Sequence, residues 1–136
     1  MTAYDKALSL LSIREHTKKE LRDKLLQKGF PSAETEEAIT KLEGEGFISE
    51  KRYCQCFIRS RLRKNPEGKK LIAMRLIEKG IPRSTAYDEV DSYFEENSEE
   101  IKEIFTEYEQ KLVRLKGSEK AAQTLMRKCI KLSDYE

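Results

Sequence analysis

A short stretch that occurs twice decides the fold of this 136-residue chain. It reads Leu25-Leu26-Gln27-Lys28-Gly29-Phe30-Pro31 and, 51 residues later, Leu76-Ile77-Glu78-Lys79-Gly80-Ile81-Pro82. In each copy, two aliphatic residues are followed by one polar residue and then by Lys-Gly, an apolar residue and proline. Glycine after such a run is typical of a helix C-terminus, and proline cannot continue the helix. The chain is therefore predicted to contain at least two equivalent helical units.

The residues around the first copy have the spacing of amphipathic helices. Apolar residues recur at helical intervals from Tyr4 to Leu11, which predicts a helix over Thr2 to Ile13. Thr17 followed by Glu20 is a capping-box pattern and predicts the start of a second helix that runs to Lys28. A third helix is predicted after Pro31-Ser32, ending between Gly44 and Gly46.

The same order follows in the second half of the chain. Helices are predicted from Ser49 to Lys64 and from Lys69 to Lys79, separated by Asn65-Pro66-Glu67-Gly68. A weaker third copy covers 125–130, with Cys129 in the place of glycine. We therefore expect an all-α fold of tandem three-helix repeats, each about 50 residues, stacked in an elongated, curved array. The predicted units are 1–48, a basic unit 49–97, and 98–136, which lacks its last helix.

The net charge of +2 conceals a strong segregation along the chain. Residues 1–50 carry a net charge of −2, residues 51–83 carry +9, and residues 84–136 carry −5. Ten acidic residues and one lysine lie between Asp88 and Glu109. A basic block of this density is typical of a surface that binds phosphates or an acidic protein. Solvated helix faces, or pairing of the basic helices with the acidic stretch, are the alternative explanations.

The residue types that usually carry catalysis or metal binding are scarce. There is one histidine, His16, in a predicted loop, and the six glycines form no phosphate-binding loop. Three cysteines and no secretion signal indicate a reducing cytoplasm, and Cys54 and Cys129 are expected on buried helical faces. No apolar run is long enough to cross a membrane. We therefore expect a monomeric cytoplasmic protein that is not an enzyme, with no cofactor, metal site or catalytic residue.

Ordered motifs along most of the chain resemble the RecX family, the bacterial regulators of the RecA recombinase. The first motif carries Ala7-Leu8, Arg14, His16-Thr17, Glu20-Leu21, Lys24-Leu25 and Lys28-Gly29-Phe30. The second carries Arg52-Tyr53-Cys54, Phe57-Ile58-Arg59-Ser60-Arg61, Gly68, Ile72, Leu76 and Lys79-Gly80-Ile81. The resemblance implies a non-enzymatic protein that binds RecA–DNA filaments in their helical groove and limits recombinase and coprotease activity. It also implies a role in DNA repair and the SOS response.

The basic block supplies the residues expected to contact the filament or DNA. These candidates are Arg52, Arg59, Arg61, Arg63, Lys64, Lys69, Lys70, Arg75 and Lys79. The partners expected from the resemblance are the RecA filament and DNA, either single- or double-stranded. The main alternative is a sequence-tolerant DNA-binding helical module that acts without a protein partner. A third possibility is an adaptor for some other helical protein.

Overall fold

The computed structural model of the protein describes residues 1–135, and this part of the chain folds into helices without a β-strand. The helices are α1 (Ala3–Ile13), α2 (Lys18–Gln27), α3 (Ser32–Gly44), α4 (Glu50–Lys64), α5 (Lys69–Glu78), α6 (Arg83–Glu96), α7 (Ser98–Lys116), α8 (Ser118–Arg127) and the 3₁₀ helix η1 (Leu132–Tyr135). The predicted all-α class and the tandem three-helix organisation are confirmed.

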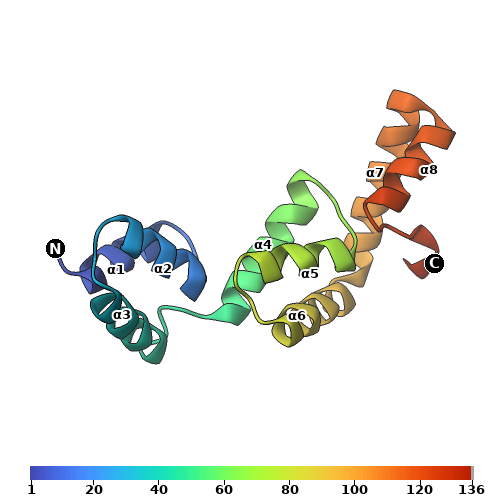
Figure 1. Ribbon diagram of the computed structural model, residues 1–136. Helices are drawn as coiled ribbons and strands as arrows, with labels where there is room; N and C mark the ends of the chain where they lie inside the picture. Colours follow the sequence, from blue (N-terminus) through green and yellow to red (C-terminus); the bar gives the residue numbers. More distant parts are fainter. Residues whose placement is uncertain (136) are drawn as a thin grey trace.

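The helices follow one another along an elongated molecule, with the two termini at opposite ends (Figure 1). Helix α3 packs on α1 and α2, and α6 packs on α4 and α5. The predicted boundaries fall between α3 and α4 and between α6 and α7. The division into three units remains a prediction, and we use it for naming: the first module is 1–48, the second 49–97, and the third begins at 98.

The local sequence signals place the helix ends as predicted. Thr17 and Glu20 form a reciprocal capping box at the start of α2, and Thr2 and Asp5 form one at α1 that the periodicity alone does not reveal. Gly29 and Gly80, after α2 and α5, have φ angles of +94° and +104°. These values lie in the left-handed region that glycine enters without steric cost.

Two separate apolar cores hold the array together. One lies inside the first module and is built by residues such as Leu21, Leu25 and Leu42. The other is continuous from Tyr53 in α4 to Ile130 after α8, so the second and third modules share it. The apolar stripe expected on α4 is confirmed, because Tyr53, Cys54, Ile58 and Leu62 are buried and Phe57 is partly buried.

The expectation for Cys129 is wrong, whereas the expectation for Cys54 is confirmed. Cys54 is buried in the second core, and burial raises the pKa of its thiol to about 12. Cys129 is exposed and has a φ of +60°. It follows helix α8 at the position where the two earlier repeats carry Gly29 and Gly80. The residue therefore serves as a helix stop in a left-handed conformation and does not lie on a helical face.

Candidate functional site

The nine basic residues proposed from the sequence fall into two groups in the structure. Four of them make ion pairs inside the molecule, namely Arg52, Arg61, Lys69 and Arg75. The other five are exposed and have no ion-pair partner among residues 1–135, namely Arg59, Arg63, Lys64, Lys70 and Lys79. Internal compensation therefore applies to part of the basic block, and the second group remains available to a partner.

The strongest internal pairing is centred on Glu67, in the loop between α4 and α5. Its side chain is only 2% exposed and accepts hydrogen bonds from Arg61 Nε at 2.6 Å and from Arg75 Nη2 at 2.6 Å. Burial alone would raise the pKa of this carboxyl group, but the two guanidinium groups outweigh it and hold the pKa below its usual value. Arg61 and Arg75 thus hold a loop in place, as well as being candidates for partner contact.

Two further candidates are tied to neighbouring elements. Arg52 Nε donates to Glu15 Oε1 at 3.0 Å, and its Nη2 donates to the carbonyl oxygen of Gly46 at 2.8 Å, so it links α4 to the first module. Lys69 Nζ lies 3.7 Å from Asp91 Oδ1 of α6. These exposed pairs contribute about 0–1 kcal/mol each, so both side chains can exchange their partners at low cost.

Two of the unpaired candidates lie at the end of α4, beside a cavity of about 390 Å³. Arg63 and Lys64 line this cavity together with Glu107, Tyr108 and Lys111 of α7. One turn earlier, Arg59 lies on the same side of α4 as Arg63, and both line a smaller hollow with Glu100. The cavity therefore presents three cations and one carboxylate at the boundary between the second and third modules.

Sequence reasoning missed the contribution of the third module to this surface. Lys128 of the third module lies with its Nζ 4.9 Å from the centre of the Tyr108 ring and donates to Asn65 Oδ1 and the Pro66 carbonyl. Summing the charge over shorter segments would have predicted this contribution, because seven basic residues and one acidic residue lie between Lys111 and Lys131. The acidic stretch before Lys111 conceals this excess when residues 84–136 are summed together.

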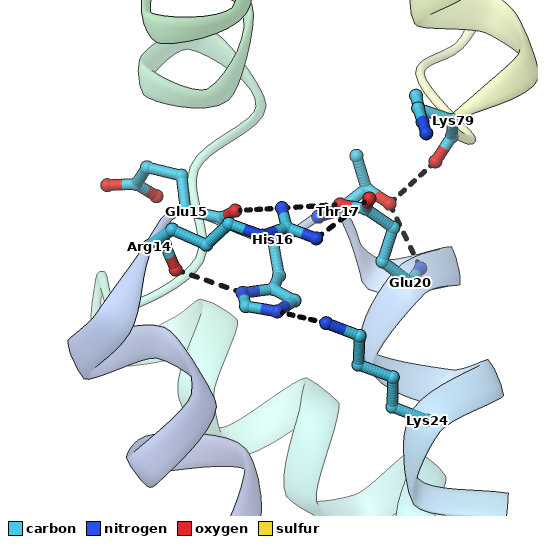
Figure 2. A network of polar contacts seen from close by, with 7 residues as sticks. All are labelled: Arg14, Glu15, His16, Thr17, Glu20, Lys24 and Lys79. Atoms are coloured by element: carbon cyan, nitrogen blue, oxygen red, sulfur yellow. Dashed lines mark hydrogen bonds and ion pairs between the residues drawn. The ribbon is translucent and has the colours of Figure 1, made fainter. Parts of the chain in front are cut away.

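A second polar network lies where the first module meets the second (Figure 2). His16 is 2% exposed; its Nδ1 lies 2.9 Å from the Arg14 carbonyl oxygen and its Nε2 lies 2.9 Å from Lys24 Nζ. An ammonium group can only donate, so Nε2 accepts and Nδ1 carries the proton that it donates to the carbonyl. Beside it, Thr17 Oγ1 donates to the carbonyl oxygen of Lys79 at 2.6 Å. His16 therefore links the end of α1 to α2 within the first module, next to the residue that contacts the second module.

Comparison with known proteins matches both halves of this architecture. Residues 3–42 match the first three-helix domain of RecX, and residues 49–88 match its second three-helix domain. The chain belongs to the RecX family. The two RecX domains end shortly before the third module, so α7, α8 and η1 lie outside the matched ranges.

Curated relatives and solved structures that resemble this chain are named RecX. The regulatory protein RecX of Chlorobium phaeobacteroides is 34% identical over 71% of this chain and 63% of its own length. RecX of Prosthecochloris aestuarii is 32% identical over 67% of this chain and 60% of its own length. The chain thus spans about 60% of the length of these relatives.

The likeness to a solved RecX structure extends beyond the matched domains. A crystal structure of regulatory protein RecX aligns with a TM-score of 0.79 and 25% identity over 98% of this chain and 69% of that one. The structure of RecX from Lactobacillus salivarius aligns with a TM-score of 0.75. This chain therefore shares its helical fold with solved structures of RecX. Over residues 1–135, every helix is too short or too polar to cross a lipid bilayer.

Proposed function

We propose that this RecX-family chain regulates a RecA recombinase by binding along the RecA–DNA filament, and that it does so without catalysis. The single observation that supports this most is the exposed group Arg59, Arg63 and Lys64 on α4, which lines the cavity and the smaller hollow at the module boundary. A filament offers acidic phosphates and protein walls together, and an elongated helical array with a basic middle is suited to both. Bound in the groove, the chain would slow strand exchange and coprotease activity.

The test is charge reversal of these three residues, R59E, R63E and K64E. We expect the triple variant to bind RecA–single-strand filaments more than tenfold more weakly at fixed salt, measured by co-sedimentation, because three favourable contacts become repulsive. The matched control reverses three exposed lysines elsewhere, Lys28, Lys41 and Lys102, which changes the net charge equally. Equal weakening by both triples would contradict a localised basic surface.

Comparing binding to bare DNA with binding to RecA-coated DNA distinguishes the proposed function from the alternative, which is sequence-tolerant binding to bare DNA. The five unpaired candidates give that alternative its support, because lysine and arginine contacts to phosphate need no protein partner. We expect tighter binding to RecA-coated DNA than to bare DNA, and a slower RecA strand exchange in the presence of the chain. Tighter binding to bare DNA, together with unchanged strand exchange, would favour the alternative.

A further inference from the structure

The junction between the first and second modules contains no helix packing. Among the helices of residues 1–135, α1, α2 and α3 pack only on one another, whereas α4 packs on α5, α6 and α7 and so joins the second and third modules. The two apolar cores have no residue in common. Neighbouring units of one chain move relative to each other unless their interface is large and apolar. The first module therefore meets the condition for independent motion.

A few polar side chains make the contacts that hold this junction together. Thr17 Oγ1 donates to the carbonyl oxygen of Lys79 (Figure 2), and Lys19 Nζ donates to that of Glu78 at 3.3 Å. From the other side, Arg52 donates to two acceptors of the first module. The bonds of Lys19 and Arg52 are exposed to solvent, where polar contacts of long side chains contribute little to stability. The orientation of the first module is therefore held weakly.

Unfilled space lies beside these contacts. A cavity of about 270 Å³ is lined from the first module by Arg14 and Glu15 and from α4 by Tyr53, Cys56, Phe57 and Ser60. A packed protein interior, in contrast, contains few voids larger than a water molecule. The first module can therefore turn toward α4 or away from it without compressing a packed interface.

The backbone passes from the first core to α4 within two residues. Ile48 is 4% exposed and belongs to the first core, and Ser49 is the N-cap of α4. The link between α3 and α4 runs as an extended segment between the first module and the rest of the chain (Figure 1). Hinges are a few residues at the ends of elements that absorb changes in φ and ψ. Ser49, with a φ of −143° and a ψ of 117°, is the residue in that position.

We propose that Ser49 is a hinge on which the first module turns relative to the second and third, and that Arg52 and Lys19 hold it in the orientation that Figure 1 shows. Turning the first module changes its position relative to the basic residues of α4. The chain thereby fits partner surfaces of different curvature. This motion belongs to the free chain, so the proposal stands independently of filament binding.

Distances between two spin labels, measured by double electron–electron resonance, test the hinge in the full chain. The exposed cysteines are first removed as C56S/C129S, and the buried third cysteine is left in place. One pair of labels, at E37C on α3 and D88C on α6, spans the hinge, and all label positions are exposed. The other pair, D88C and Q110C on α7, spans the shared core. We expect the distance distribution of the first pair to be at least twice as wide as that of the second.

Removing the two long side chains should widen the first distribution further. We expect K19A/R52Q to widen it at least 1.5-fold and to leave the second distribution unchanged, because only contacts across the hinge are lost. The matched control, K28A/K51Q, removes the same two charges at exposed positions on α4 and after α2. It should leave both distributions unchanged.

E50P should have the opposite effect. Proline is tolerated at the first position of a helix, and it restricts the preceding residue to the extended region, where Ser49 already lies. We expect E50P to narrow the first distribution at least 1.5-fold. Equal widths for the two pairs in the unmodified chain would overturn the proposal. It would also be overturned if K19A/R52Q left the first distribution unchanged or widened both distributions alike.

Discussion

Each of the two junctions between neighbouring modules contains a hydrogen bond to a main-chain carbonyl oxygen, but the donor group differs. At the first junction, Thr17 Oγ1 donates to the carbonyl oxygen of Lys79 at 2.6 Å. At the second, the backbone N–H of Gly68 donates to the carbonyl oxygen of Lys128 at 2.8 Å. Thr17 and Gly68 are the N-caps of α2 and α5, and they lie 51 residues apart. In both cases, the start of one module's second helix meets the end of the next module's second helix.

The junctions differ in how closely the chains approach. A Cβ atom on Gly68 would lie 1.8 Å from the carbonyl oxygen of Cys129, so the backbones there are in direct contact. At the first junction, a threonine side chain fills the same space and reaches the carbonyl through its hydroxyl group. The junction at Gly68 lies inside one continuous core, and the junction at Thr17 lies between two cores. At Thr17 the close approach is to a side chain, because a Cβ atom on Gly80 would lie 2.6 Å from Lys19 Cβ. Close backbone approach therefore accompanies a shared core, and side-chain contact accompanies separate ones.

The buried ionisable residue also differs between the junctions. His16 with Lys24 in the first module and Glu67 with Arg75 in the second occupy equivalent positions, each 51 residues apart. Both His16 and Glu67 are 2% exposed. One junction thus contains a neutral imidazole beside an ammonium group, and the other a carboxylate between two guanidinium groups.

The largest effect is expected for G68A, which tests the close approach directly. Its φ of −77° is ordinary for alanine, so the cost comes from the collision with the Cys129 carbonyl and from loss of the hydrogen bond to Lys128. We expect the free energy of unfolding to fall by about 3 kcal/mol, measured by urea denaturation. T17A should cost only about 1 kcal/mol. G44A is the control, because a Cβ there meets nothing within 4 Å; a G68A effect no larger than that of G44A would contradict the comparison.

A smaller effect is expected for E67Q, which keeps the shape of the buried side chain and removes its charge. Arg61 and Arg75 then face a neutral amide, and we expect a loss of about 2 kcal/mol in the free energy of unfolding. E103Q, at an exposed position, should change it by less than about 0.5 kcal/mol. If both variants unfold at the same urea concentration, Glu67 does not hold the second junction.

The two junctions should also lose stability in different pH ranges. Burial, reinforced by Arg14 and Lys24, lowers the pKa of His16 below 6.5. As pH falls below 6.5, the unfolded chain therefore takes up a proton before the folded chain does, and the free energy of unfolding decreases. The pKa of Glu67 is lowered below 4.5, so its contribution is present above pH 4.5 and is lost only at more acidic pH.

The measurement is the urea midpoint at pH 7.5 and at pH 5.5. We expect the unmodified chain to be less stable at pH 5.5 and H16Q to lose this difference. Because His16 is the only histidine, other side chains of that type cannot supply the effect. A pH dependence that persists in H16Q would assign it to carboxyl groups and not to His16.

The smallest effect is a gain of stability in C129G. Cys129 holds a φ of +60° without the freedom of glycine, whereas Gly29 and Gly80 occupy the equivalent positions. Removing the side chain should raise the free energy of unfolding by about 1 kcal/mol. The reverse change, G29A, should lower it by about 1 kcal/mol, since a Cβ there meets no neighbour and only the backbone conformation is affected. A loss of stability in C129G would show that the thiol makes a contact that outweighs the backbone strain.

Periodicity and helix-end residues predicted most of the fold, because these signals are local. The capping box at Thr17, the stop at Gly80 and the break before Gly68 each lie within a few residues of what they determine. The candidate site was predicted less completely, because pairing is non-local. Arg61 and Arg75 are indistinguishable from Arg59 in the sequence until the loop between α4 and α5 brings Glu67 to them. Likewise, only the packing of α4 near α7 brings Lys111 beside Arg63 and Lys64.

The acceptors at both junctions are main-chain carbonyl oxygens, those of Lys79 and Lys128. Every amino acid carries this atom, so substitution at either position leaves the acceptor in place. The side chains of Lys79 and Lys128 can therefore change while both acceptors keep their hydrogen bonds to Thr17 and Gly68. This agrees with a TM-score of 0.79 to a structure that shares only 25% of its residues with this chain. In an array joined in this way, the residue types at positions 79 and 128 do not determine whether the two joints form.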